Sequence, residues 1–265
     1  MILNGKNITK KLEVNLKRQI KKLNRPPCLA IILVGKNPAS LIYVKLKEKK
    51  ASVLGIKIKR FDFPSSTSQK NIIALIKNLI KKTDGIIVQL PLPKHLNINK
   101  IIETIPVELD VDGFRKNSLF VSPTHQAILC LLKKNKIKLA GKKAVILANS
   151  FIFSQPLKKL LEKEKIKTEI LINPSKQNFS RFDIIITALG KPYFIKPKMI
   201  NKKNIIIDVG YNRVKGKPVG DVDPKCQKVA TFVSPVPGGI GPLTIFFLLK
   251  NVYLSAKNKQ ALLKK

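Results

Sequence analysis

The segment from Pro235 to Thr244 constrains the fold of this chain more than any other stretch. It holds three prolines and three glycines in ten residues, which neither a helix interior nor a central strand tolerates. We therefore predict a tight loop here, whose glycines let the backbone approach another group closely. An apolar helix is predicted to follow from Leu243.

Apolar runs and helical periodicity alternate along the rest of the chain, which predicts an α/β fold. A chain of 265 residues, 44% of them hydrophobic, is long enough for one or two globular domains. The expected helices span residues 9–23, 40–54, 68–82, 124–134, 156–165 and 243–263. The expected strands span residues 29–34, 57–63, 85–90, 144–147, 167–172, 183–188 and 204–209. The strands of the second half form a Rossmann-like succession.

The formal net charge of +37 is compatible with binding to nucleic acid or to small anions. However, only six of the 52 basic residues are arginines, and the lysines are spread over the whole chain. Recognition of bases and bidentate recognition of phosphates favour arginine. We interpret the charge as mainly compositional and expect no specific nucleic-acid partner.

The cysteines and histidines predict no metal site. Cys28, Cys130 and Cys226 are far apart and odd in number, as is typical of reduced thiols in a cytosol. They lack the close pairing of zinc ligands, and His95 and His125 are isolated from them. The start of the chain has no apolar core of signal-peptide length, and no run is long enough for a membrane span. These features predict a cytoplasmic protein without a membrane partner.

Tyr43 and Lys47 are the first candidate catalytic pair. They are four residues apart on an expected helix, so their side chains share one face, and partial burial would lower the pKa of the amine. Short-chain dehydrogenases use the same pair but place it after the nucleotide loop, whereas here it comes before the expected nucleotide domain. Gln89 lies at the carboxyl end of a buried strand, where open α/β sheets bind ligands.

Four segments, in order, resemble the signatures of the methylenetetrahydrofolate dehydrogenase/cyclohydrolase (FolD) family. They span residues 37–47, 85–93, 110–114 and 235–244. The resemblance implies a folate-binding catalytic domain at 1–116, with a C-terminal helix at 243–265 returning to it, and a Rossmann-like domain at 117–242. It implies NADP-linked oxidation of 5,10-methylenetetrahydrofolate and hydrolysis of the methenyl product to 10-formyltetrahydrofolate. Tetrahydrofolate derivatives are the implied partners, and the implied assembly is a homodimer.

The resemblance also assigns roles to single residues. Lys47 is the implied general acid/base group, assisted by Tyr43 and Gln89, and Asp112 accepts hydrogen bonds from the pterin ring. The family pattern implies that Asp110 is structural and bonds nearby backbone amides. The implied substrate-binding residues are Tyr43, Gln89, Leu90, Pro91, Asp112, Pro237, Gly238, Gly239, Gly241 and Thr244. The implied cofactor-binding residues are Ala148, Asn149, Ser150, Ser175, Gly190, Tyr211 and Gly239.

The nucleotide loop departs from the family pattern Gly-Arg-Ser-x-x-Val-Gly-x-Pro. In the segment 148–156, Ala148 and Ser154 stand where the glycines are usual, Asn149 replaces the Arg, and Phe153 replaces the Val. A Cβ at the glycine positions restricts approach to a pyrophosphate, and loss of the Arg removes a bidentate phosphate partner. His125 lies in a second departure, the segment 122–125, where Pro-Cys-Thr-Pro is usual. We therefore expect weak NADP binding.

Two alternatives stay open at this stage. One is a cyclohydrolase-only enzyme whose second domain serves as a scaffold. The other is a non-catalytic, basic, nucleic-acid-associated protein on the same fold. The presence of Tyr43, Lys47, Gln89 and Asp112 together favours an enzyme over the latter.

Overall fold

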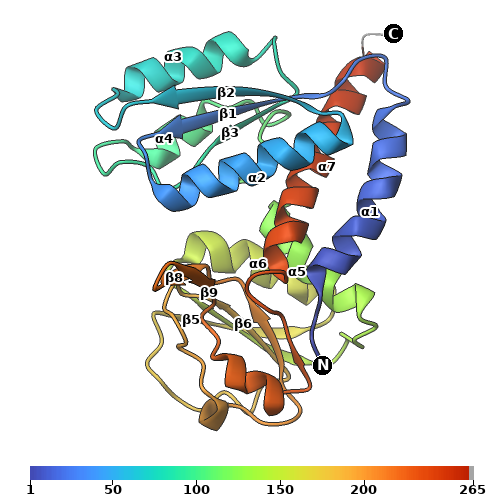
Figure 1. Cartoon of the computed structure of the whole chain (residues 1–265), viewed down its shortest axis with the longest axis vertical. Helices are drawn as coiled ribbons and strands as arrows, with labels where there is room; N and C mark the ends of the chain where they lie inside the picture. The colour runs from blue at the N-terminus through green and yellow to red at the C-terminus, as the bar shows by residue number, and fades with distance from the viewer. Residues whose placement is uncertain (263–265) are drawn as a thin grey trace. The chain divides into compact units, whose positions relative to one another are not determined.

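A computed structural model describes residues 1–262 of the chain (Figure 1). By their internal contacts the residues divide into two compact units. Residues Lys11–Pro123 and those from Ile245 onward form what we call the three-stranded unit. Residues Met1–Lys10 and Thr124–Thr244 form the five-stranded unit. The predicted helix 243–265 has its last three residues outside the described part.

The three-stranded unit is a parallel sheet covered by helices. Its strands β1 (Cys28–Val34), β2 (Lys57–Phe63) and β3 (Gly85–Val88) run in the order β2-β1-β3. Its helices are α2 (Pro38–Leu54), α3 (Gln69–Leu79) and α4 (Ile98–Glu103), and α2 lies on the opposite side of the sheet from α3 (Figure 1). Every residue of β1 is buried, as a continuous apolar run predicts for a central strand.

The start of helix α2 follows from its sequence. The side chain of Asn37 accepts hydrogen bonds from the backbone N–H groups of Ala39 and Ser40, and Pro38 occupies the first helical position. Because β1 ends at Val34, this cap begins α2 just beyond the carboxyl edge of the sheet. One face of α2 is buried and includes Lys47.

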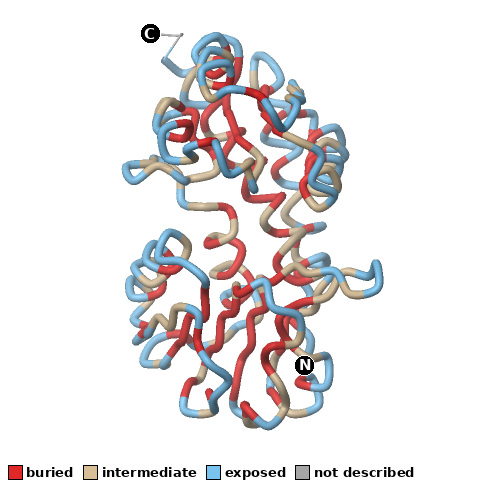
Figure 2. Tube along the Cα trace, turned by 90° about the vertical axis from the view of Figure 1, so that its left-hand side faces the viewer, coloured by how far each residue is buried: buried red, intermediate tan, exposed pale blue. Residues whose placement is uncertain are grey.

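The five-stranded unit is a Rossmann-like parallel sheet. Its strands are β4 (Lys143–Ala148), β5 (Lys167–Ile172), β6 (Ile184–Ala188), β7 (Ile205–Asp208) and β10 (Phe232–Val233). They run in the order β10-β7-β6-β4-β5, so the chain reverses its direction across the sheet between β4 and β6. In such sheets ligands bind at the carboxyl ends of the strands beside this switch point. The buried strands of this sheet are red in Figure 2.

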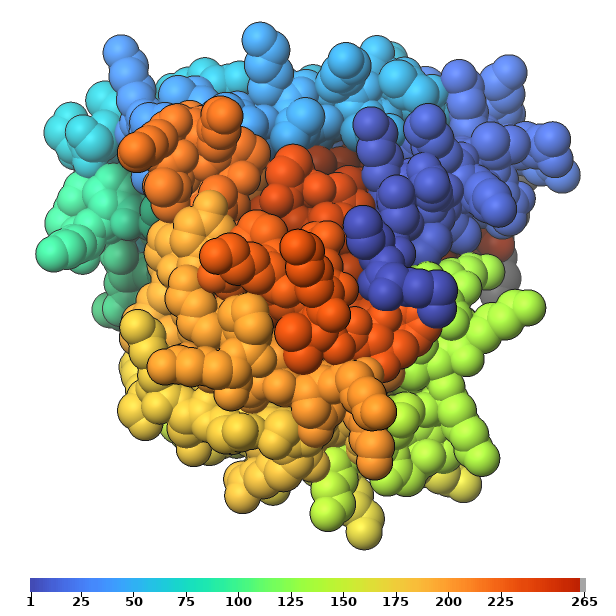
Figure 3. Space-filling view, turned by 60° about the horizontal axis from the view of Figure 1, so that its bottom comes forward, coloured from blue at the N-terminus to red at the C-terminus, as the bar shows by residue number. Residues whose placement is uncertain are grey.

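Helices and short segments complete the five-stranded unit. The helices are α5 (Pro123–Lys134) and α6 (Phe151–Lys163), with two short helices at Pro197–Met199 and Pro224–Lys228. An antiparallel hairpin joins β8 (Asn212–Val214) and β9 (Lys217–Val219). Leu3 N–H donates to the Val233 carbonyl at 3.0 Å, which adds the first residues to the sheet edge. Figure 3 shows these residues in dark blue beside the orange-red surface.

Two helices each have one part in the five-stranded unit and the other part in the three-stranded unit. Helix α1 (Gly5–Ile20) and helix α7 (Ile240–Leu262) both cross a boundary between the units. Beyond Ile245, α7 packs in the three-stranded unit, where Asn251 Nδ2 donates to the Val111 carbonyl at 2.9 Å and Ser255 Oγ to the Glu108 carbonyl at 2.8 Å. It also lies beside α1 (Figure 1), so the predicted return of the C-terminal helix is confirmed.

Some predicted boundaries were wrong. Helix α6 begins at Phe151 rather than at 156, because Pro156 lies inside the helix instead of at its first position. Helix α7 begins at Ile240 rather than Leu243, so Gly241 and Pro242 form its first turn, where a missing N–H costs nothing. Helix α4 and the β8–β9 hairpin were not predicted because both are short. No helix in residues 1–262 has the length and apolarity needed to cross a membrane.

Candidate functional site

Lys47 and Gln89 form the centre of a polar cluster in the three-stranded unit. Lys47 projects from the buried face of α2, and Gln89 follows directly after β3. Lys47 Nζ donates to Gln89 Oε1 at 2.9 Å, so the structure brings these two predicted residues together. Tyr43 lies one turn before Lys47 on the same helix and is half-buried.

Burial controls the protonation of this cluster. Lys47 is only 8% exposed, and its desolvation lowers the pKa of the amine, while the negative charge of Asp112 acts in the opposite direction. Burial likewise raises the pKa of the Asp112 carboxyl, and the Lys47 charge counteracts that rise. The lowered pKa brings the Lys47 amine closer to a state that can exchange a proton at neutral pH.

The backbone carbonyl of Leu90 orients Gln89. It accepts the Gln89 side-chain Nε2 at 2.8 Å, which turns the amide oxygen of Gln89 toward Lys47. Ser40 Oγ donates to the same carbonyl at 3.0 Å. Pro91 is joined to Leu90 by a cis peptide bond, and β3 ends at Val88, two residues before the predicted end of this strand at residue 90. Ser40 was not among the predicted site residues, although it lies in the segment 37–47 that pointed to the family.

The neighbouring carboxylates Asp110 and Asp112 have different roles. The buried Asp110 accepts the backbone N–H groups of Phe114 at 3.3 Å and Arg115 at 2.9 Å. The prediction that Asp110 is structural is therefore confirmed. It fixes the turn that carries the half-buried Asp112, whose charge acts on Lys47.

The glycine-rich loop belongs to the five-stranded unit, together with the predicted substrate residues Pro237, Gly238, Gly239, Gly241 and Thr244. Its backbone packs against the start of α1, where Lys6 N–H donates to the Gly238 carbonyl at 3.0 Å. A Cβ on Gly5 would lie 1.8 Å from the Gly239 carbonyl oxygen, so only glycine fits at this crossing. The tight loop predicted from the sequence is present, and its observed close approach is to helix α1.

The predicted cofactor residues gather at one edge of the five-stranded sheet. Ala148 ends β4, and Asn149 and Ser150 connect β4 to α6. Ser175 follows β5, Gly190 follows β6 and Tyr211 follows β7. Because these strands are parallel neighbours, all of these residues follow carboxyl ends along the same edge.

The residues at this edge fit a dinucleotide. The first N–H groups of α6 lack partners within the helix, and the Ser150 side chain makes no capping bond to them. Such a helix start attracts phosphate. Gly190 leaves open space, since a Cβ there would have Asn212 Oδ1 as its nearest neighbour, at 3.9 Å.

The departures in the nucleotide loop have separate structural effects. Ala148 and Ser154, which replace the usual glycines, are fully buried, and Ser154 Oγ donates to the Ser150 carbonyl at 3.0 Å. Their Cβ atoms therefore face the protein interior. Asn149, which replaces the Arg, donates through Nδ2 to the Leu189 carbonyl at 2.6 Å and thus links the ends of β4 and β6. Of these three residues Asn149 alone is exposed, so the loss of the Arg is the change that lies open to solvent.

Two departures from the family pattern contact each other. The rings of His125 on α5 and Phe153 on α6 pack edge to face, with centroids 5.0 Å apart. His125 is 4% exposed, and its Nε2 has no hydrogen-bond partner. Burial lowers the pKa of His125 to about 4, although a hydrogen bond with the Phe153 backbone acts to raise it. This contact could not be predicted from the sequence, because the two segments are far apart along the chain.

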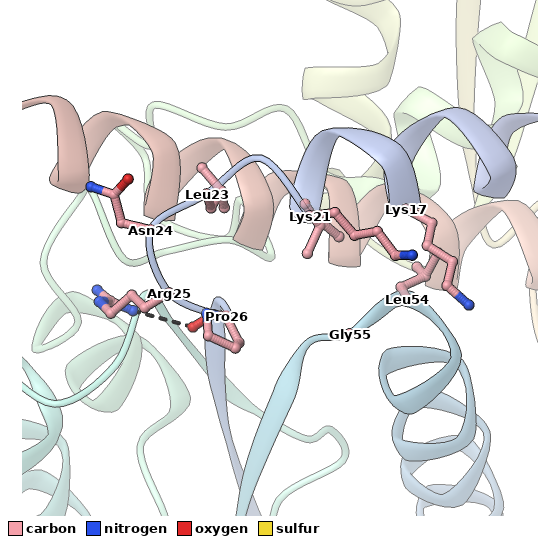
Figure 4. A pocket seen from close by; sticks show the side chains of 9 residues that line it. Lys17, Lys21, Leu23, Asn24, Arg25, Pro26, Leu54 and Gly55 are labelled. Carbon is pink, nitrogen blue, oxygen red and sulfur yellow. Dashed lines mark hydrogen bonds between the residues drawn. The ribbon is translucent and has the colours of Figure 1, made fainter.

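A separate surface hollow of about 270 Å³ lies at the amino edge of the three-stranded sheet. Lys17, Lys21, Arg25 and Leu54 are among its lining residues (Figure 4). The Arg25 guanidinium is already engaged by the buried Asp84, with contacts of 2.6 and 2.7 Å. This hollow shares no residue with the Lys47 cluster.

Comparison with protein families covers both parts of the chain. Residues 3–112 match the tetrahydrofolate dehydrogenase/cyclohydrolase catalytic domain. Residues 122–260 match the tetrahydrofolate dehydrogenase/cyclohydrolase NAD(P)-binding domain.

Individual relatives match over nearly their whole length. The bifunctional protein FolD of Campylobacter hominis is 39% identical, covering 99% of each chain. That of Aquifex aeolicus is 38% identical, covering 98% of this chain and 97% of the relative. Among solved structures, the FolD enzyme of Campylobacter jejuni has a TM-score of 0.92 at 36% identity, covering 98% of this chain and 99% of that chain. The Trypanosoma brucei enzyme, solved with NADP cofactor and an inhibitor, has a TM-score of 0.90 at 27% identity, covering 98% of each chain. The chain therefore belongs to the tetrahydrofolate dehydrogenase/cyclohydrolase (FolD) family.

Proposed function

We propose that the chain is a bifunctional enzyme of one-carbon folate metabolism in which Lys47 transfers the protons. The observation that carries this role is the buried Lys47 amine, held at 2.9 Å by Gln89 and facing the charge of Asp112. In the hydrolytic reaction a water molecule attacks the cationic methenyl carbon of the folate. Lys47 accepts one proton of that water and returns it to the ring nitrogen as the carbon–nitrogen bond breaks. The remaining hydroxyl proton leaves to solvent as the formyl C=O forms, which gives 10-formyltetrahydrofolate.

The other residues of the cluster bind and orient the substrate. Asp112 accepts hydrogen bonds from the pterin N–H groups. Gln89, fixed by the Leu90 carbonyl, holds the Lys47 amine in place, and Tyr43 packs at one side of it. The glycine-rich loop supplies further folate contacts through Pro237, Gly238, Gly239, Gly241 and Thr244. We also propose the domain limits: a folate-binding catalytic domain at 1–116 with the helix 243–265, and a dinucleotide-binding domain at 117–242.

The cofactor of the oxidation is proposed to be NADP, held at the carboxyl edge of the five-stranded sheet. When bound, it accepts a hydride from the methylene carbon of the folate. The six residues after β5, Asn173 to Asn178, contain a lysine and no carboxylate. An acidic side chain is what binds the ribose 2′-hydroxyl of NAD in such folds, whereas a cationic one accommodates the 2′-phosphate of NADP. Ser150, Ser175 and Gly190 are the proposed contacts.

Replacement of Lys47 tests the proposed mechanism. We expect Lys47→Ala to reduce methenyltetrahydrofolate hydrolysis by ~10²–10⁴-fold, as loss of a positioned acid/base group does, with the fold retained. Lys49→Ala, an exposed lysine on the same helix, is the matched control and should keep parental rates. Near-parental hydrolysis of methenyltetrahydrofolate by Lys47→Ala would show that another group transfers the proton.

A second candidate is a cyclohydrolase-only enzyme, favoured by the bond that occupies the side chain of Asn149 where the family has a phosphate-binding Arg. Isothermal titration with NADP distinguishes the two, since no binding at millimolar NADP would favour the second.

We also propose a homodimer, on family resemblance alone. Light scattering coupled to size-exclusion chromatography measures this directly, and a monomeric mass at micromolar concentration would refute it.

A further inference from the structure

The buried carboxylate of Asp221 lies beneath the cofactor edge of the five-stranded sheet. Asp221 is 0% exposed and follows β9. Its Oδ2 accepts Thr187 Oγ1 at 3.0 Å and Leu189 N–H at 2.7 Å. Its Oδ1 accepts Lys191 N–H at 2.8 Å and Asn212 Nδ2 at 3.0 Å. One side chain thus receives four hydrogen bonds, from the end of β6, the loop that follows it and the start of β8.

These bonds fix the segments that carry the proposed cofactor contacts. Leu189 and Lys191 flank Gly190, so both peptide N–H groups beside this glycine end on the same carboxylate. Asn212 follows Tyr211 directly and ties the loop after β7 to the same group. The Leu189 carbonyl in turn accepts Asn149 Nδ2 at 2.6 Å, which attaches the β4–α6 connection.

Other groups hold Asp221 rigidly. Its own backbone N–H donates to Oδ1 of the buried Asp208 at 3.1 Å, and Gly210 and Val222 N–H groups bind the same Asp208 carboxylate at 2.9 Å each. A Cβ on Gly210 would lie 2.3 Å from the Asp221 carboxylate, so the loop after β7 passes directly over it. A group with this many fixed donors does not move without moving the loops.

We propose that Asp221 is a positioning residue for the dinucleotide, setting the loops after β4, β6 and β7 in the arrangement that NADP requires. The inference rests on the cofactor edge proposed above. Asp221 is itself buried beneath the loops and acts through Gly190, Asn212 and Asn149. It has no direct role at Lys47, which belongs to the other unit.

The bifunctional chemistry makes the proposal testable. Asp221→Asn keeps the shape of the side chain but replaces one acceptor oxygen by an NH₂ group, which faces two hydrogen-bond donors and repels them. The loops should then shift, and we expect the dissociation constant for NADP to rise at least tenfold in isothermal titration. Methenyltetrahydrofolate hydrolysis, measured without dinucleotide, should stay within twofold of the parent. Asn212→Ala removes a single donor and should give a smaller rise. Asp223→Asn, two residues further on and more exposed, is the matched control and should leave the affinity unchanged.

The outcomes separate this inference from the function on which it rests. A folded Asp221→Asn variant that binds NADP as tightly as the parent overturns the positioning role. Loss of hydrolysis and of affinity in equal proportion, together with a lower unfolding midpoint, also overturns it by showing general destabilisation. If Asp221→Asn does not fold, Asn212→Ala decides, and an unchanged affinity there counts against the proposal. A parent that binds no NADP would instead contradict the proposed cofactor edge.

Discussion

Within the Lys47 cluster, the charge of Asp112 and the burial of the amine act on the same pKa in opposite directions. Burial lowers the pKa of Lys47, and Asp112 raises it. We predict that Asp112→Asn lowers the Lys47 pKa further, so that the limb of the hydrolysis pH–rate profile due to Lys47 moves to lower pH. The profile should be measured at saturating folate, because the variant also loses pterin contacts. Asp62→Asn, a change at an exposed carboxylate, is the control and should leave the pH–rate profile unchanged. If the limb did not move in Asp112→Asn, the limb would not belong to the titration of Lys47.

The buried His125 predicts a pH dependence of stability. The folded pKa of His125 is lowered to about 4 from 6.5, so the unfolded chain binds this proton more tightly than the folded chain. The associated stability is fully present above about pH 6.5 and is lost as the pH falls toward 4, for a total of about 3 kcal/mol. We expect the parent to lose this free energy of unfolding on acidification in urea titrations, and His125→Leu to lack that component.

The comparison between parent and variant isolates His125 from other titrating groups. Burial raises the pKa of Asp208 to about 7, so Asp208 contributes stability that declines as the pH rises from about 4 to 7, which is the opposite slope. Both chains carry this contribution, and it cancels in the difference. Identical slopes for parent and His125→Leu would mean that His125 is not neutral in the folded protein.

Among the elements, helix α6 and the connection before it decide how NADP binds. Ala148 and Ser154 are buried, whereas Asn149 is exposed, so Asn149 is the departure that lies open to solvent. We predict that Asn149→Arg alone tightens NADP binding roughly ten- to a hundred-fold, the worth of a charge-assisted hydrogen bond, with hydrolysis nearly unchanged. Gln227→Arg adds the same charge at an exposed position as a control. Sub-micromolar binding by the parent, unimproved by Asn149→Arg, would reveal other phosphate contacts.

Helix α7 is attached to the three-stranded unit through polar side chains. Asn251 is 2% exposed and donates to the buried turn that precedes Asp112. We predict that Asn251→Ala lowers the free energy of unfolding by about 1–3 kcal/mol, because it removes the side-chain donor to the buried Val111 carbonyl. Asn258→Ala, an exposed asparagine on the same helix, should have almost no effect. Equal denaturation midpoints for the two variants would show that the Asn251 bonds are replaceable.

The sequence predicted elements well where local physics decides. β1 was recognised because a central parallel strand is a continuous apolar run, and β2 and β5 were placed at their observed bounds. The start of α6 was misplaced because a proline usually marks the first helical turn, whereas Pro156 lies farther inside. The strand order and the His125–Phe153 contact could not be predicted, since both join residues distant in sequence. The Lys47–Gln89 pair was predicted only through family resemblance.

For the molecule as a whole, the net charge of +37 comes mainly from lysines spread along the chain and not from a cluster of arginines. We predict that duplex DNA binds weakly at physiological salt, without sequence preference, and that the affinity falls steeply with ionic strength, as a general phosphate term requires. Fluorescence anisotropy with duplexes of different sequence, including a randomised one, measures this affinity across a salt series. Tight binding to one sequence at physiological salt would support a nucleic-acid role for the charge.

Because the three-stranded unit takes its last helix from the end of the chain, its parts are not synthesised together. After Met1–Lys10, residues Lys11–Pro123 leave the ribosome, Thr124–Thr244 follow, and the part of α7 from Ile245 emerges after them. The five-stranded unit can thus complete its fold while the three-stranded unit still lacks its last helix. Until then, the apolar surface against which the buried α7 residues Leu248, Leu249 and Val252 pack stays exposed. A released chain that ended before Ile245 would contain all of the five-stranded unit but would lack the part of α7 that completes the three-stranded unit.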